Sequence, residues 1–224
     1  MKNELLINFK NVSFSFNGKG LFERVNLKIF QGEIFMLVGD SGSGLTTFLR
    51  LVSGLIKPLK GMIKVLDVDI HNASEVELMK VRQKIGFIFQ NGALLNNMTL
   101  IENVALPIRY HTNFKEKKIY KIAREKLRFA GIEKWETELP AQLSEECVKR
   151  GGLARALALE PRIIFCDELT FGFGGYHSNC ILNLFKKLAV ENKITPIIVS
   201  QDKSIGKNLV DRVGVIKNER IEII

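Results

Sequence analysis

Apolar residues recur along this chain in two patterns, one typical of strands and one typical of helices. Near the start, Val12–Phe16 alternates apolar and small residues, Asn17-Gly18 supplies a turn, and Leu21–Ile29 continues the strand pattern. We expect these segments to form an antiparallel β layer. Short apolar runs typical of buried strands follow at Ile34–Val38, Met62–Val65, Ile85–Phe89, Ile163–Cys166 and Pro196–Val199.

Segments with helical periodicity alternate with these strands. We expect helices at Phe48–Val52, Ala73–Gln83, Thr99–Arg109, Lys115–Ala130, Arg150–Leu159 and His177–Glu191. Thr99, followed three residues later by Glu102, is a capping-box pattern. A terminal hairpin of Arg212–Lys217 and Arg220–Ile224 is also expected. Strands that alternate with helices predict an α/β fold with a mostly parallel sheet.

A glycine-rich stretch separates the strand at Ile34–Val38 from the helix at Phe48–Val52. It follows the phosphate-loop pattern G-x-x-x-x-G-K-[ST] at every specified position except the lysine, which is Leu45. Successive backbone N–H groups of such a loop form a concave anion site that needs glycine rather than lysine. The candidate nucleotide-binding residues of the loop are Gly39, Ser41, Gly42, Ser43, Gly44, Leu45, Thr46 and Thr47.

Further polar residues stand at the ends of predicted strands, where ligands bind in open α/β sheets. They are Gln90, Asp167, Glu168 and Gln201. The Thr46 hydroxyl and the Asp167 carboxylate are suited to Mg²⁺, and Glu168 is placed to polarise a water molecule.

Phe14 or Phe16 is a candidate to stack on an adenine ring. As strand residues, both are equally suited to point into the core.

Composition and charge narrow the class of protein. Hydrophobic residues make up 46% and charged residues 25%, as in ordinary globular proteins. No apolar run approaches the roughly 20 residues of a membrane-spanning helix, and no signal peptide is expected, so we expect a cytosolic chain. The net charge of +9 suits an anionic membrane surface, but no arginine–aromatic interleaving indicates nucleic acid. The three cysteines, Cys147, Cys166 and Cys180, are expected to be free thiols.

The order of these motifs resembles that of an ATP-binding cassette (ABC) transporter nucleotide-binding subunit over essentially the whole chain. The matching positions are Gly39–Thr47 (Walker A), Gln90 (Q-loop), Leu143–Cys147 (signature), Asp167–Glu168 (Walker B), Phe171–Gly175 (D-loop) and Gln201 (switch). The resemblance implies a P-loop NTPase-type domain over residues 1–224, with an antiparallel β layer and a helical subdomain at about 91–160. It also implies ATP as ligand, with Mg²⁺ near Thr46, Gln90 and Asp167.

A narrower resemblance is carried by Phe89–Leu95, Met98-Thr99 and Glu102–Arg109. These segments are similar to the ATPase of the maintenance-of-lipid-asymmetry (Mla) systems. That resemblance implies phospholipid trafficking at the cytoplasmic face of the inner membrane. It further implies a permease that docks near Gln90–Arg109 and a substrate-binding protein with an Mce domain.

The chain departs from the family pattern at several positions expected to face the γ-phosphate. Loss of one preorganised donor, such as the lysine at Leu45, costs roughly 10²–10³ in rate. In the family, the signature Ser144 and the two residues after it contact phosphate across a dimer, and those two are Glu145 and Glu146 here. Each close like-charge contact costs up to about 4 kcal/mol at an effective dielectric constant near 20. The D-loop lacks its aspartate, and Gln201 replaces the switch histidine.

Three interpretations remain open from sequence. The chain is a transporter subunit with weakened or lost ATP binding and hydrolysis, a working but atypical ATPase, or a structural or regulatory pseudo-ATPase of a membrane complex. It pairs either with a second copy of itself or with another cassette. If hydrolysis is lost, Leu45→Lys alone is expected not to restore it, because the signature remains acidic.

Overall fold

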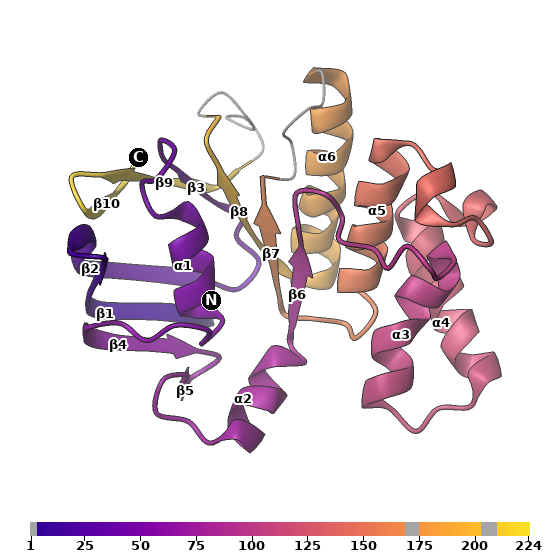
Figure 1. The fold of residues 1–224 in the computed structure, drawn as a ribbon, viewed down its shortest axis with the longest axis horizontal. Coiled ribbons are helices and arrows are strands. Elements are labelled where there is room, and N and C mark those ends of the chain that lie inside the picture. Colours follow the sequence, from indigo (N-terminus) through magenta and orange to yellow (C-terminus); the bar gives the residue numbers. More distant parts are fainter. Residues whose placement is uncertain (1–3, 169–174, 203–209) are drawn as a thin grey trace. The chain divides into compact units, whose positions relative to one another are not determined.

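The described part of the chain, residues 4–168, 175–202 and 210–224 of a computed structural model, divides into two units (Figure 1). We call Met1–Gln83 with Gly172–Ile224 the strand-rich unit, and Lys84–Phe171 the helical unit. The parallel and antiparallel strands, together with the helices, confirm the predicted α/β class. No helix in the described ranges is long and apolar enough to cross a bilayer.

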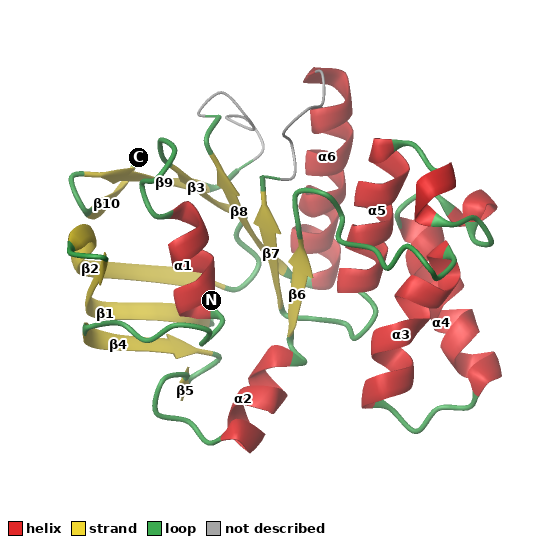
Figure 2. Ribbon diagram, viewed as in Figure 1, coloured by secondary structure: helices red, strands yellow, loops and turns green. Residues whose placement is uncertain are grey.

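An antiparallel sheet forms one layer of the strand-rich unit. Its strands are β1 (Leu5–Phe16), β2 (Lys19–Phe30), β4 (Lys60–Val65) and β5 (Val68–Asp69), in the order β2-β1-β4-β5. The predicted hairpin at Asn17-Gly18 is confirmed, because Phe16 pairs with Lys19 across that turn. Helix α1 (Leu45–Val52) packs on this layer, as Figure 2 shows, and the rings of Phe9 and Phe48 stack at 5.3 Å.

The same unit holds a group of parallel strands. β3 (Phe35–Val38) lies between β8 (Thr195–Ser200) and β9 (Arg212–Lys217) and is parallel to both. The terminal hairpin is confirmed, since β10 (Arg220–Ile223) pairs antiparallel with β9. All residues of β3 and β8 are buried, which explains the continuous apolar runs Phe35–Val38 and Pro196–Val199. Helices α2 (Glu75–Arg82) and α6 (Gly175–Asn192) complete the unit.

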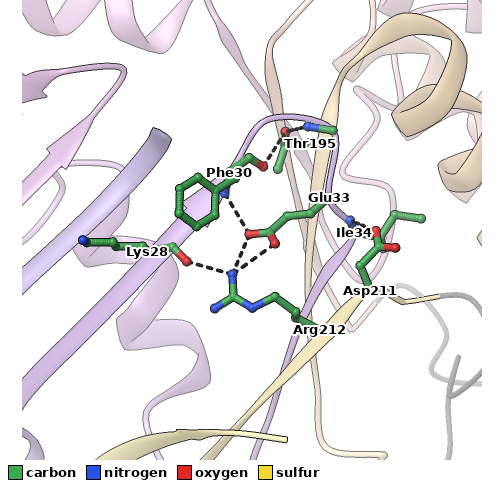
Figure 3. A network of polar contacts seen from close by, with 8 residues as sticks. Lys28, Phe30, Glu33, Ile34, Thr195, Asp211 and Arg212 are labelled. Atoms are coloured by element: carbon green, nitrogen blue, oxygen red, sulfur yellow. Dashed lines mark hydrogen bonds and ion pairs between the residues drawn. The ribbon is translucent and has the colours of Figure 1, made fainter. Parts of the chain in front are cut away.

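A polar network fixes the amino ends of these parallel strands (Figure 3). Arg212 Nη1 donates to both carboxylate oxygens of Glu33 at 3.0 Å and to the Lys28 carbonyl at 3.0 Å. Glu33 also accepts from the Phe30 N–H at 2.8 Å. Since Arg212 begins β9 and Glu33 precedes β3, these bonds set the start of one strand relative to the other.

Helices dominate the helical unit. They are α3 (Leu100–His111), α4 (Glu116–Phe129) and α5 (Glu145–Ala156), with short 3₁₀ turns at Glu133–Trp135 and Pro140–Gln142. Strands β6 (Ile85–Ile88) and β7 (Ile163–Asp167) run parallel beside them. The core of the unit contains Leu100, Val104, Ile119, Leu127 and Ala154.

Two helix starts in this unit bear on the predictions. The capping box predicted at Thr99 and Glu102 is present, because each side chain accepts the other's backbone N–H. The expected start of a helix at Arg150 is wrong. Helix α5 begins at Glu145, because the Ser144 hydroxyl caps it by accepting from the Cys147 N–H at 3.3 Å.

Candidate functional site

The phosphate-loop sequence lies between β3 and α1 in the strand-rich unit. The Gly39 N–H donates to the Ser200 carbonyl at 3.3 Å, the Ser43 N–H to the Asp40 carbonyl at 3.0 Å, and the chain enters α1 at Leu45. Gly44 caps the helix with φ +114°, and a Cβ there would lie 3.0 Å from the Phe22 ring. Only glycine fits this position without strain.

The amino end of α1 keeps the features of an anion site. Gly44 provides no side-chain cap, and the first turn contains no acidic residue. The backbone N–H groups of a helix start are therefore not satisfied by a capping side chain. The Ser43 hydroxyl is buried and has no hydrogen-bond partner in the described part of the chain. A phosphate group fits this loop, since it would supply acceptors for both kinds of donor.

Leu45, at the lysine position, belongs to the core. It is the first residue of α1 and only 8% exposed. The neighbouring Thr46 and the loop residue Ser41 are exposed, while Thr47 is half-buried. The loop therefore retains its backbone shape and its hydroxyl groups, but the position that carries positive charge in a complete phosphate loop carries an apolar side chain.

Two other predicted residues of this unit are accessible. β3 and β8 pair with Val38 opposite Ser200, so Gly39 and Gln201 follow the two strands at the same edge of the sheet. Gln201 is exposed there. Phe16, the last residue of β1, is 62% exposed. Its ring is available for stacking, and the alternative that it points into the core is wrong.

A second set of predicted residues lies in the helical unit. β6 and β7 pair with Ile88 opposite Cys166, so Gln90 and Asp167 follow these strands at one edge. Gln90 is exposed, Asp167 is half-buried and Glu168 is buried. Glu168 also has a left-handed backbone with φ +49°, a conformation that in residues with a Cβ is found mainly at turns and functional sites.

The two acids of the signature segment have a local role in helix α5. Glu145 pairs with Lys149 at 2.8 Å, and Glu146 pairs with Arg150 at 2.8 Å, each one helical turn further on. Both acids also stand in the first turn of α5, where they interact favourably with the helix dipole. Each of the two acids is therefore paired with a cation of its own helix, and their contact with phosphate stays a prediction.

Sequence reasoning missed two residues that hold the segment after Gln90. Arg155 donates to the carbonyls of Ala93 at 2.7 Å and Gly92 at 3.1 Å, and its burial lowers its pKa from the ordinary value. Asn103 is fully buried, and its amide donates to the Leu95, Met98 and Thr99 carbonyls at 3.0–3.1 Å. An arginine or asparagine inside an otherwise apolar helical run is the signal that could have revealed both.

An apolar groove of about 570 Å³ lies in the helical unit. Phe87, Phe89, Leu95, Leu106, Pro107 and Tyr110 line it, and Arg155 and His111 add polar groups. Of these, Phe89, Leu95 and Tyr110 are among the large apolar side chains that remain exposed. An exposed apolar hollow of this kind is typical of a surface that binds another protein.

The predicted D-loop falls at residues 171–175, of which 171–174 lie outside the described part of the chain. The Cys147 and Cys166 side chains are buried free thiols, as expected, and burial raises the pKa of the Cys166 thiol. No cluster of three or more potential metal-ligating side chains occurs within the described ranges.

A strand–glycine loop–helix unit and a helical unit of this kind define an ATP-binding cassette, and the comparisons with known proteins agree. The ABC transporter family matches residues 22–171, and the chain belongs to this family. The solved dimeric ATP-binding cassette MJ0796, bound to ADP and phosphate, aligns with a TM-score of 0.86 and 31% identity over 97% of both chains.

Two curated relatives differ in the cargo their names give. The intermembrane phospholipid transport ATP-binding protein MlaF of Haemophilus influenzae is 35% identical over 98% of this chain and 83% of its own length. The probable ribonucleotide transport ATP-binding protein mkl of Mycobacterium leprae is 36% identical over 94% of this chain. The chain spans only 60% of that mycobacterial relative.

Proposed function

We propose that this chain is the nucleotide-binding subunit of a membrane transporter that moves phospholipid, and that its ATP hydrolysis is impaired or absent. The observation that carries the loss of hydrolysis is Leu45, a buried leucine at the lysine position of a loop whose backbone is kept. The lipid cargo is supported by the similarity to MlaF along nearly the whole chain.

In this proposal the loop binds the phosphates of ATP through the backbone N–H groups at the start of α1. Phe16 would stack on the adenine ring, and the family resemblance proposes Thr46, Gln90 and Asp167 as the residues that would hold Mg²⁺, which would neutralise phosphate charge. Glu168 orients the attacking water in any residual hydrolysis. Gln201 donates a hydrogen bond to phosphate but brings no charge, so neither Leu45 nor Gln201 offsets charge that develops during cleavage.

The apolar groove of the helical unit is proposed to receive a helix of the permease, within the predicted region Gln90–Arg109. Its exposed rings, Phe89 and Tyr110, provide the apolar anchors, and Arg155 and Asn103 keep the groove-lining turn in place. Docking there would hold the chain at the cytoplasmic face of the inner membrane. An Mce-type substrate-binding protein is the further partner we propose, and the second cassette is either a copy of this chain or a different one.

One observation favours a working but atypical ATPase as the second candidate. The signature acids Glu145 and Glu146 are already paired with Lys149 and Arg150. Their repulsion of phosphate is therefore smaller than that of two free carboxylates. Since Glu168 is also retained, slow turnover is the outcome that this candidate predicts.

Nucleotide titration and phosphate release separate the two candidates. We expect weak binding of a fluorescent ATP analogue with Mg²⁺, and phosphate release from the purified complex equal to that of the Glu168→Gln variant. Turnover in the native chain that disappears in Glu168→Gln would establish the working ATPase instead. Comparing the native chain with Glu168→Gln controls for contaminating ATPases, because both proteins carry the same loop and are purified in the same way.

Docking and cargo need their own tests. Phe89→Glu should abolish co-purification with the permease, whereas Met79→Glu, at a similarly exposed apolar residue outside the groove, should not. Lipid transfer between vesicles carrying the assembled complex then separates a transporter from a pseudo-ATPase. Transfer that requires ATP supports transport, while a complex that assembles with this chain but transfers no lipid supports a structural role.

A further inference from the structure

The turn between α3 and α4 carries an unusual concentration of positive charge. Four lysines stand within seven residues at the start of α4, and all are exposed; we call Lys115, Lys117, Lys118 and Lys121 the lysine corner. The one acid among them, Glu116, is held by Arg109 through two bonds of 2.8 Å. Within the part of the chain that the structure describes, no ion pair is formed by any of the four lysines.

The remaining cations of α4 behave differently. Arg124 pairs with Glu136 at 2.8 Å, Lys126 with Glu160 at 3.2 Å, and Arg128 with Glu133 at 3.8 Å. The helix thus neutralises its charges in its second half and leaves them uncompensated in its first. The excess of positive charge is local to the lysine corner rather than a property of the whole helix.

The amino end of α4 is an unfavourable position for lysine. The amino end of a helix carries partial positive charge, so cations in the first turn oppose it. Helices α2, α3 and α5 each start with a serine or threonine cap and acids in the first turn. Helix α4 also has an acid in its first turn, Glu116, but it has Lys115 at its cap position and no side-chain cap. A helix start that departs from the usual pattern in this way is expected where a partner supplies the missing negative charge.

Exposed aromatic residues border the lysine corner. Tyr110 is 77% exposed at the end of α3, and Phe114 is 41% exposed in the turn, with the Lys118 ammonium 3.4 Å from the centre of its ring. Aromatic rings beside lysines are the combination found where proteins meet the headgroup region of a bilayer.

We propose that the lysine corner, with Tyr110 and Phe114, binds the surface of an anionic phospholipid bilayer. Tyr110 also lines the groove offered above as the permease site, so docking of a membrane protein in that groove would bring the corner to the membrane. The link between permease docking and the position of the lysine corner rests on the proposed function. A bilayer fits better than nucleic acid because the charges are lysines on one short turn, without arginine forks for bases or phosphates.

Vesicle sedimentation with the intact chain tests the proposal without the permease or nucleotide. The native chain should bind vesicles containing 30% phosphatidylglycerol and not vesicles of phosphatidylcholine alone, with binding lost as salt rises. Each lysine near an anionic leaflet strengthens binding by roughly fivefold. Replacing all four with glutamine should therefore weaken binding by a factor on the order of 10²–10³.

A charge-matched control distinguishes a site from the net charge of the chain. Glutamine at Lys10, Lys19, Lys28 and Lys60, exposed lysines of the strand-rich unit, removes the same four charges. This control should retain most of the binding. The corner variant should also unfold at the same or a higher temperature than the native chain, since its lysines oppose the helix dipole.

Three results would overturn the proposal. They are equal binding to neutral and anionic vesicles, equal loss in the two quadruple variants, and tighter binding to a DNA duplex than to vesicles at the same salt. None of these results tests the groove as the permease docking site. That proposal is tested by co-purification of the Phe89→Glu variant with the permease. The Phe89→Glu variant should still bind anionic vesicles even though it does not recruit the permease. That result would support membrane binding by the lysine corner independently of the docking surface.

Discussion

The two acids at the start of α5 provide the sharpest test of the local role of the signature segment. We expect Glu145→Gln with Glu146→Gln to destabilise the fold, because each acid has both an ion pair one turn away and a place in the first turn of the helix. The pairs differ in environment. Lys149 is 1% exposed opposite an exposed Glu145, whereas Glu146 and Arg150 are both largely covered.

The magnitude follows from these contacts. An exposed pair on a helix contributes about 0.3–0.5 kcal/mol, and an acid in the first turn contributes about 0.3–1 kcal/mol through the helix dipole. Since one member of each pair is largely buried, values near the upper ends apply, and the double variant should lose about 2–3 kcal/mol. For a chain of this length that corresponds to a fall in the melting temperature of roughly 4–12 °C.

Urea unfolding followed by circular dichroism measures this loss. Glu75→Gln is the matched control, because Glu75 is also a first-turn acid but lies 3.9 Å from Arg82 and is highly exposed. The control should change the free energy of unfolding by about 0.3–1 kcal/mol, the helix-dipole contribution alone. If the double variant unfolds at the same urea concentration as Glu75→Gln, the acids do not stabilise α5, and the reasoning from the paired carboxylates fails.

Three further variants test the scaffold and the ligand contacts. Glu33→Gln should lower the free energy of unfolding by about 2 kcal/mol in urea titrations, because Arg212 and the Phe30 N–H lose a charged acceptor; an unchanged midpoint would contradict this. Asn103→Leu should cost about 3 kcal/mol in the same assay, since the Leu95 N–H and the Leu95 and Met98 carbonyls lose their side-chain partner, and it should also weaken permease co-purification. Phe16→Ala should leave stability unchanged and weaken nucleotide binding by roughly fivefold or more in fluorescence titrations; equal affinities would remove Phe16 from the site.

Local patterns predicted most of the secondary structure because the relevant signals are short-range. Runs such as Phe35–Val38 and Pro196–Val199 are buried on both faces and therefore apolar throughout. The capping box at Thr99 lies within four residues and could be read directly. The periodicity places the start of α5 at Arg150, although Ser144 and the two acids after it are typical of a helix start. The same three residues also match the phosphate-contacting signature of the family, and the two signals compete.

The contacts that hold the candidate site together could not be predicted in this way. Glu33 and Arg212 are 179 positions apart, and Arg155 reaches a carbonyl 62 positions away. Such pairs depend on how the strands and helices come together, which periodicity does not encode. The burial of Leu45 is a similar case, since it follows from the first turn of α1 facing the core rather than from the loop sequence.

Leu45 is the departure on which the proposed loss of hydrolysis most depends, because the signature acids are paired with cations within α5. In Leu45→Lys the side-chain stem can occupy the same buried space, while the ammonium can extend toward the loop. A charge-assisted bond contributes about 1.5–3 kcal/mol, so nucleotide affinity should rise by about 10- to 150-fold. Phosphate release should stay at the level of the same variant carrying Glu168→Gln, because Gln201 still brings no charge to the phosphate. Release that rises well above that control would mean that one lysine is sufficient for turnover, and that the paired acids of the signature impose no barrier to it.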